Sequence, residues 1–339
     1  MSKMEGLITE INRKAKEEIV SIGLNDFSYK RIPFTSPRMN YCTYGGLPIG
    51  KLIEFYGEEH GGKTTTALDV VANYQCSDDG RRVLYCDCEN TLDVDWAKKL
   101  SVDVDNMYIL QPKAQSAEEI FQFICDSVET GEIGLFVIDS LGVMLSAQEL
   151  EKTMEDKTYG GISKALTLFS KRIEMLMQRH RCTGIGINQM REDMNSMWGG
   201  QTTPGGKAWK HCCAVRMQFS RGKFIDETGR ELTRGAENPA GNIVQMSMTK
   251  NKTCKPDRRT GYYTLRYDSG VDYLNDLIDV AIRFGIILQS GAWFDIVDTE
   301  SGELIDGKLH GKNSVRDAIL NSPNLLSIIE SAVNIHVRQ

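Results

Sequence analysis

An eight-residue stretch near residue 60 carries the clearest chemical signal in the sequence. It reads Gly57-Glu58-Glu59-His60-Gly61-Gly62-Lys63-Thr64 and fits the phosphate-loop pattern G-x-x-x-x-G-K-[ST]. Glycines let such a loop curl so that backbone N–H groups point at phosphate oxygens, and the helix that follows adds partial positive charge. In this pattern Lys63 reaches the terminal phosphates and the Thr64 hydroxyl binds Mg²⁺. The loop, with Thr65 directly after it, predicts nucleotide binding.

A second acidic group should stand near the metal, at the end of a neighbouring buried strand. Residues 134–140 read Gly-Leu-Phe-Val-Ile-Asp-Ser, an apolar run that ends in Asp139. This pattern predicts that Asp139 holds Mg²⁺, although a helix cap after a core strand would also explain it. Glu89 follows another apolar run at the same carboxyl edge, where ligands bind in such folds. We predict that it activates the attacking water; a solvated loop carboxylate is the alternative.

The elements that must position these residues follow from the apolar pattern. Predicted strands cover 51–56, 82–87, 107–110, 135–139 and 183–188, and predicted helices cover 62–76, 94–100, 116–129 and 160–180. Continuous apolar strands that alternate with helices indicate an α/β fold, a mostly parallel twisted sheet with helices on both faces. Residues 214–220, 242–250 and 262–267 alternate like antiparallel strands. A helix from about 273 to 284 opens a smaller C-terminal unit.

The N-terminal segment 5–22 has apolar residues close to helical spacing, with charged residues between them. It predicts an amphipathic helix of about five turns. Such a helix either contacts another subunit or packs on its own domain.

Composition narrows the class of protein. The 339 residues predict about two domains, and 41% hydrophobic with 25% charged residues excludes global disorder. No apolar run approaches the roughly 20 residues of a membrane span. The net charge of −6 excludes a protein that coats nucleic acid by bulk charge, but not a local basic groove. Nine cysteines without a Cys-x-x-Cys pair, and no secretory leader, favour reduced thiols in a cytoplasmic protein.

The sequence resembles the bacterial RecA recombinase family over most of its length. Beyond the phosphate loop, the resemblance rests on residues 45–50, 87–93 with 96–100, 187–191, 250–252 and 291–294, in the family's order. It implies a RecA-like P-loop ATPase core at 31–270, an N-terminal oligomerisation helix within 1–30 and a small α+β C-terminal domain at 271–339. The implied cofactors are ATP and Mg²⁺.

The resemblance also implies roles at matching positions around the nucleotide. Beyond the phosphate loop these positions are Glu89, Asp93, Trp96, Asp139, Gln189, Lys250, Lys252 and Tyr267. Glu89 is implied to be the catalytic glutamate, and Gln189 to sense the γ-phosphate. Asp93 is implied to bond the base edge and Trp96 to stack on adenine, although Trp96 by itself would suit a core position. Lys250 and Lys252 are implied to cross a subunit interface and stabilise transition-state charge, with Tyr267 near that interface.

Two loops, near 150–160 and 190–206, are implied to bind DNA. The second is long and polar, which suits a segment that becomes ordered on a ligand. The residues implied to contact DNA are Lys164, Lys171, Arg191, Met197, Trp198, Gly205 and Gly206. A solvated helix face is the alternative for the first two. Glu192 and Asp193 place negative charge after Arg191, and His211 replaces a larger aromatic, so we expect an altered coupling between loop and nucleotide.

The resemblance implies an ATP-dependent protein of homologous recombination and DNA repair. It would form a head-to-tail helical filament on single-stranded DNA, pair it with double-stranded DNA and exchange strands. Single-strand binding proteins, mediator proteins and a self-cleaving repressor of the SOS response are implied as further partners. Two alternatives stay open: a RecA-fold accessory paralogue that regulates recombination without strand exchange, and a ring-forming RecA-fold helicase.

Overall fold

The computed structural model describes residues 2–15, 20, 29–151, 161–192, 201–233, 237–298 and 301–338. The chain divides into two compact units, Met1–Lys30 and Arg31–Gln339. In the first, helix α1 (Lys3–Ala15) buries none of its residues. The Asn12 amide donates to the Val20 carbonyl at 2.7 Å and accepts from the Val20 N–H at 2.9 Å. Val20 is not helical, so the prediction of one continuous helix from 5 to 22 is wrong at that residue, whose backbone bonds the Asn12 side chain instead.

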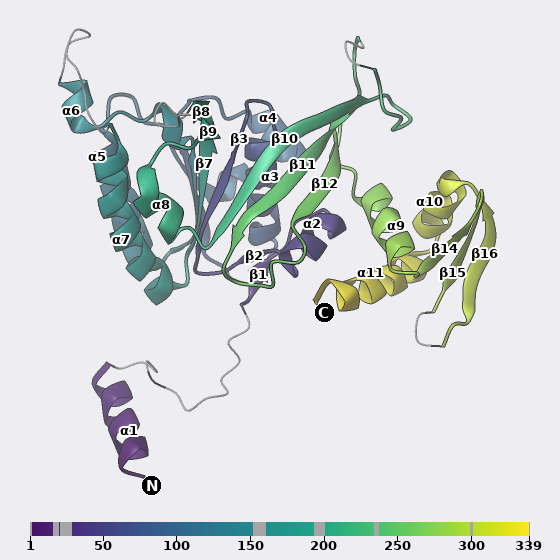
Figure 1. Ribbon diagram of the computed structural model, residues 1–339, viewed down its shortest axis with the longest axis horizontal. Coiled ribbons are helices and arrows are strands. Elements are labelled where there is room, and N and C mark those ends of the chain that lie inside the picture. Colours follow the sequence, from purple (N-terminus) through teal and green to yellow (C-terminus); the bar gives the residue numbers. More distant parts are fainter. Residues whose placement is uncertain are drawn as a thin grey trace. The chain divides into compact units, whose positions relative to one another are not determined.

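A nine-stranded sheet runs through the described part of the larger unit, in the order β13-β12-β11-β10-β3-β7-β6-β4-β5. Figure 1 shows β12, β11, β10, β3 and β7 of this sheet side by side. The strands are β3 (Leu52–Gly57), β4 (Arg82–Asp87), β5 (Met107–Leu110), β6 (Ile133–Asp139), β7 (Thr183–Gln189), β10 (Val215–Ile225), β11 (Gly241–Asn251), β12 (Thr260–Arg266) and β13 (Gly270–Val271). From β10 to β5 each strand runs parallel to its neighbour, whereas β11, β12 and β13 pair antiparallel. A separate short pair joins β1 (Arg31–Ile32) to β2 (Leu47–Pro48).

Helices cover both faces because the central strands are apolar on both sides. In β6, Leu135 and Val137 join the core under α2 (Pro37–Thr43), α3 (Lys63–Gln75) and α4 (Val94–Lys99). Phe136 and Ile138 point the other way, into the core under α5 (Ala117–Glu129), α7 (Ser163–His180) and α8 (Gly206–Cys212). The predicted α/β fold is confirmed, with elements within a few residues of their predicted bounds.

The C-terminal elements have a hydrophobic core of their own. They are α9 (Tyr273–Arg283), β14 (Ile287–Ser290), β15 (Trp293–Val297), β16 (Leu304–His310), α10 (Lys312–Asn321) and α11 (Pro323–Arg338). Strands β14, β15 and β16 form an antiparallel sheet that packs with the helices around Ile296 and Ile329. Asp276 of α9 links them to the larger sheet's helices, because it accepts from Ser36 Oγ at 2.5 Å and pairs with Arg38 Nε at 3.2 Å.

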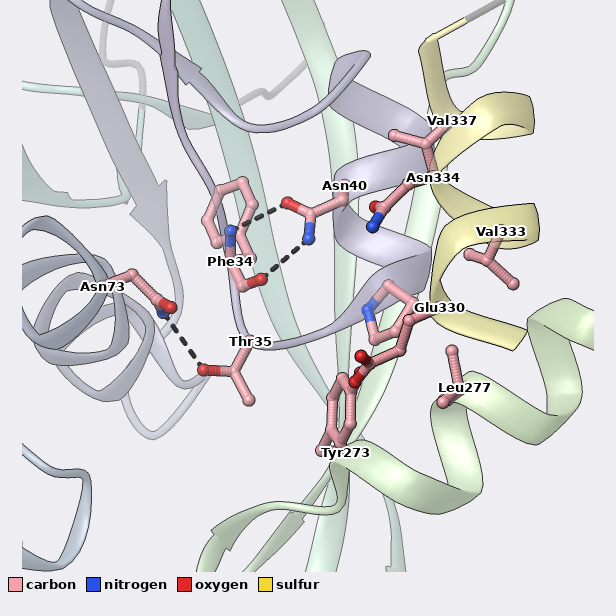
Figure 2. Close-up of a pocket in the computed structure, with 11 residues that line it drawn as sticks. Phe34, Thr35, Asn40, Asn73, Tyr273, Leu277, Glu330, Val333, Asn334 and Val337 are labelled. Atoms are coloured by element: carbon pink, nitrogen blue, oxygen red, sulfur yellow. Dashed lines mark hydrogen bonds between the residues drawn. The ribbon is translucent and has the colours of Figure 1, made fainter. Parts of the chain in front are cut away.

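A cavity of about 480 Å³ lies where α2 and α3 approach α9 and α11. Figure 2 shows Asn73 of α3 bonded to Thr35, and Tyr273 of α9 beside Glu330 of α11. Asp69, one turn before Asn73, accepts from the Thr35 N–H at 3.1 Å. The phosphate-loop helix is thus hydrogen-bonded directly to the segment that leads into α2.

All nine cysteines fall in the described ranges, and each is a free thiol. Among the described residues, no helix is both long and apolar enough to cross a membrane.

Candidate functional site

The phosphate loop connects β3 to α3 and lies against β10. Gly57 has φ +150°, and a Cβ there would stand 2.0 Å from the Phe219 carbonyl oxygen, so only glycine fits. Gly62 caps α3 with φ +88°. The buried Lys63 donates from Nζ to the carbonyls of Gly57 at 3.1 Å and Glu58 at 2.6 Å. Burial lowers the pKa of Lys63, while the nearby carboxylates of Asp139 and Glu89 act in the opposite direction.

Two hydroxyl groups meet one carboxylate oxygen beside this loop. Thr64 Oγ1 and Tyr85 Oη each donate to Asp139 Oδ2 at 2.8 Å. Burial raises the pKa of Asp139, and the charges of Glu89 and Asp87 raise it further, whereas the two hydroxyl bonds lower it. Tyr85 was not predicted as a site residue, because within the β4 sequence it reads as an ordinary apolar core position.

The oxygen atoms at this point suit Mg²⁺. Thr64 and Asp139 supply a hydroxyl and a carboxylate from two elements that meet next to the loop. Hard oxygen ligands of this kind, with few protein contacts, are what Mg²⁺ takes beside phosphates. The two residues predicted as metal ligands are therefore brought together in a fitting donor set.

Glu89 lies directly after β4, and the backbone of β6 holds it there. The N–H groups of Cys88 and Glu89 both donate to the Asp139 carbonyl, at 2.7 and 3.3 Å. Ser140 Oγ donates to Glu89 Oε1, and Gln189 Nε2 lies 3.4 Å from the same oxygen. The structure thus joins Glu89 and Gln189 from two strand ends, with Ser140 as a third partner that was not predicted.

Asp87 shapes the turn that carries Glu89. Its carboxylate accepts from the N–H groups of Thr91 and Leu92, each at 3.1 Å, and from Gln111 Nε2 at 3.0 Å. The side chain is 2% exposed. The sequence signal that could have identified this role of Asp87 is a carboxylate at the end of a buried strand.

A cavity of about 440 Å³ opens next to the phosphate loop. Residues 60–65 form one wall, and Arg221, Asn242, Leu265 and Tyr267 form the other. Tyr267 donates to Asn242 Oδ1 at 2.9 Å. Residues 60–65 and Tyr267 were predicted as nucleotide-binding, whereas Arg221, Asn242 and Leu265 lie on alternating strands that carry no local motif.

Asp93 and Trp96 lie on α4. Asp93 caps this helix by accepting from the Trp96 N–H at 2.9 Å. The indole N–H of Trp96 points to Thr65 Oγ1 at 3.4 Å, and its half-buried ring packs on the core around α3. Trp96 therefore lies next to the start of the phosphate-loop helix, as a partly exposed aromatic.

Comparison with known proteins agrees with this geometry. The family model of the RecA N-terminal domain matches residues 3–272. The chain belongs to the RecA family. Protein RecA of Ureaplasma parvum is 33% identical over 259 residues, which are 76% of this chain and 74% of the relative. Protein RecA of Ruminococcus albus is 31% identical over 290 residues (85% and 68%), and that of Mesoplasma florum 31% over 287 residues (84% and 80%).

In this RecA-family chain, Lys250 lies on β11, four residues from the β11 position that is in register with the phosphate loop, and Lys252 follows directly after that strand. Lys250 pairs with Arg216 near the start of β10, whereas Phe219, which contacts Gly57, pairs with Met246. Lys250 Nζ donates to the carbonyls of Lys210 (2.5 Å) and His211 (3.0 Å), and Lys252 Nζ to that of His211 at 3.1 Å. Both lysines therefore cap the C-terminal end of α8 and do not contact the phosphate loop of their own protomer.

In this RecA-family chain, the two ends of the predicted second DNA loop pair with each other as short antiparallel strands. β8 (Arg191–Glu192) pairs antiparallel with β9 (Gln201–Thr202). Arg191 donates to the Gly142 carbonyl at 2.6 Å, and Lys210 Nζ to Thr202 Oγ1 at 2.6 Å. Residues 193–200, with Met197 and Trp198, lie outside the described residues, as do 152–160 of the first loop.

The remaining predicted DNA residues border that hairpin or lie on α7. Gly205 and Gly206 have φ +105° and +69° at the start of α8, and a Cβ on Gly205 would stand 2.4 Å from Leu166. Lys164 and Lys171 are exposed on α7. Their exposure leaves both the DNA role and the solvated helix face open.

Proposed function

We propose that this RecA-family chain is a DNA-dependent ATPase that assembles head-to-tail on single-stranded DNA and promotes homologous pairing and strand exchange. The observation that supports it best is the contact of Gln189 with Glu89. Gln189 ends β7, and two residues later the chain enters the β8–β9 hairpin. One side chain therefore touches the proposed base and belongs to the strand that leads into the proposed DNA loop.

Each step of hydrolysis has a residue in position. Lys63 and the loop N–H groups would hold the phosphates, and the cavity wall with Tyr267 would hold the rest of ATP. Thr64 and Asp139 would hold Mg²⁺, which neutralises phosphate charge when bound. Glu89 would take the proton from the attacking water, since its carboxylate is oriented by Ser140 and Gln189. Lys250 and Lys252, at the C-terminal end of β11, would stabilise charge in the site of a neighbouring protomer.

Assembly through unlike surfaces of identical protomers gives an open helical filament when the rotation between neighbours does not close into a ring. Such a filament would hold DNA backbones and leave base pairing to select the homologous strand. Binding should show little sequence preference and fall steeply with salt.

ATP hydrolysis with and without single-stranded DNA, in the wild type and in Glu89→Gln, tests the proposal. Strong stimulation by DNA that Glu89→Gln abolishes, by a factor of about 10² or more, is expected. Strand exchange between single-stranded DNA and a homologous duplex is the next assay. A rate of ATP hydrolysis that does not change when DNA is added would instead favour the accessory paralogue.

A further inference from the structure

We propose that Glu54 and Arg216 are positioning residues that fasten the two ends of the 190–206 segment to each other beneath the nucleotide site. This inference rests on the function proposed above. It concerns how the segment is held to the strand that carries Gln189, and Glu54, Asn188 and Arg216 are not among the predicted site residues.

Glu54 is a buried carboxylate in the middle of β3, three residues before Gly57. Its side chain is 0% exposed. A carboxylate in such a place costs several kcal/mol unless partners satisfy it. It has two, one from each neighbouring strand: Arg216 Nε of β10 donates to Oε2, and Asn188 Nδ2 of β7 donates to Oε1 at 3.0 Å.

Both partners of Glu54 also grip the far end of the segment. Arg216 Nη2 donates to Thr203 Oγ1 at 3.2 Å, and Asn188 Nδ2 donates to the Pro204 carbonyl at 3.0 Å. Thr203 is 4% exposed, so this contact is internal. Glu54, Arg216 and Asn188 form a triad, and residues 203 and 204 are hydrogen-bonded to its last two members.

Asn188 is the residue before Gln189, whose amide reaches Glu89. The triad thus includes the residue before the sensor at one end and contacts Thr203 and Pro204, just before Gly205, at the other. A shift of residues 203–204 must either carry Arg216 and Asn188 with it or break the bonds of these two side chains to Thr203 and Pro204. Because half-satisfied buried networks are costly, the arrangement favours discrete positions over gradual ones.

The shape of arginine is needed for this role. Arg216 uses Nε for Glu54 and Nη2 for Thr203, so one planar fork spans two elements. Its guanidinium lies 4.6 Å from the ring centre of Tyr56, and Thr249 Oγ1 bonds the Arg216 carbonyl at 3.2 Å. A lysine would keep the charge beside Glu54 but could not make both contacts from one rigid group.

The experiment compares Glu54→Gln and Arg216→Lys with the wild type, using oligothymidylate as the DNA. ATP hydrolysis is measured with and without DNA, and DNA affinity by fluorescence anisotropy with a non-hydrolysable ATP analogue. We expect basal hydrolysis and DNA affinity to stay within a few-fold of wild type, while the maximal stimulation by saturating DNA falls about tenfold. The DNA concentration for half-maximal stimulation should change little.

The matched control is Thr183→Val, at the opposite end of β7. Thr183 is also buried, and its hydroxyl accepts from the Gly50 N–H at 3.1 Å. It should lose a similar buried hydrogen bond and keep full stimulation. If Glu54→Gln proves unfolded by circular dichroism, Arg216→Lys alone decides, because it retains the charge pair.

Three results would overturn the inference. Stimulation in Arg216→Lys equal to that in Thr183→Val would make the triad a packing feature only. A fall in DNA affinity that accounts for the whole loss would place Arg216 in DNA binding rather than in positioning. A wild type that DNA does not stimulate would remove the proposed function itself, which separates that failure from the first two.

Discussion

The Tyr85 hydroxyl lies 2.8 Å from Asp139 Oδ2, and this buried pair joins β4 to β6 beside the phosphate loop. Tyr85 is 1% exposed. Since Thr64 donates to the same oxygen, the phenol and the threonine hydroxyl together orient the Asp139 carboxylate.

Replacing Tyr85 with Phe should weaken the use of Mg²⁺ more than it damages the fold. Loss of the bond frees Asp139 to rotate, so the Mg²⁺ concentration for half-maximal hydrolysis should rise about tenfold. The free energy of unfolding should fall by about 1–3 kcal/mol, because Asp139 loses a buried donor. The rate of ATP hydrolysis as a function of Mg²⁺ concentration measures the first effect, and unfolding by denaturant measures the second.

Tyr74→Phe is the control, since the Tyr74 hydroxyl borders Gly134 instead. An unchanged Mg²⁺ requirement in Tyr85→Phe contradicts the prediction.

Ser140→Ala should lower the turnover number while ATP still binds. Ser140 Oγ donates to Glu89 Oε1, so its loss leaves the Glu89 carboxylate with Gln189 as its one side-chain partner among the described residues. Misplacement of a base costs roughly 10- to 100-fold in rate. Steady-state kinetics should show this fall in kcat with KM for ATP within about threefold. Ser146→Ala, which removes a comparable bond to Glu149 at 2.7 Å in the cap of α6 (Ala147–Leu150), should leave kcat unchanged. Equal effects of the two changes would refute a role through Glu89.

Lys250 and Lys252 should act on the phosphate loop of another protomer. Lys63→Ala removes the loop lysine, and Lys250→Ala with Lys252→Ala removes the far lysines, so each protein alone should be nearly inactive. In an equal mixture on single-stranded DNA, random head-to-tail order places an intact loop beside intact lysines at about a quarter of interfaces. DNA-stimulated hydrolysis should recover in that proportion. If the mixture stays as inactive as its components, the lysines serve only to cap α8.

Asp69→Asn should change how stability depends on pH. Burial raises the pKa of Asp69 from 3.8 to about 6. In the wild type the proton is therefore bound more tightly in the folded state, and the stability it contributes is present below pH 4 and lost as pH rises through 6. Asn lacks this charge, so the stability of the variant relative to the wild type should rise by roughly 2 kcal/mol between pH 4 and 6.5. Urea unfolding across that range measures the difference. A constant difference would mean that Asp69 titrates normally.

The sequence by itself determined the phosphate loop, Asp139 and the α/β core. These signals are local: a motif of eight residues, or a run of apolar side chains whose period follows from strand geometry. The predicted residues Glu89 and Gln189 lay at strand ends, and parallel strands bring their carboxyl ends to one edge, so their meeting could also be expected.

Only the tertiary structure decided which side chains hold these groups in place. Tyr85 and Glu54 lie within apolar strands, and their partners Asp139 and Arg216 are 54 and 162 residues away. No local period encodes such a pair, because it depends on which strands become neighbours and in what register. The same reason explains the N-terminal helix. Its amphipathic pattern predicts helix to residue 22, whereas Val20 is not helical and its backbone bonds the Asn12 side chain.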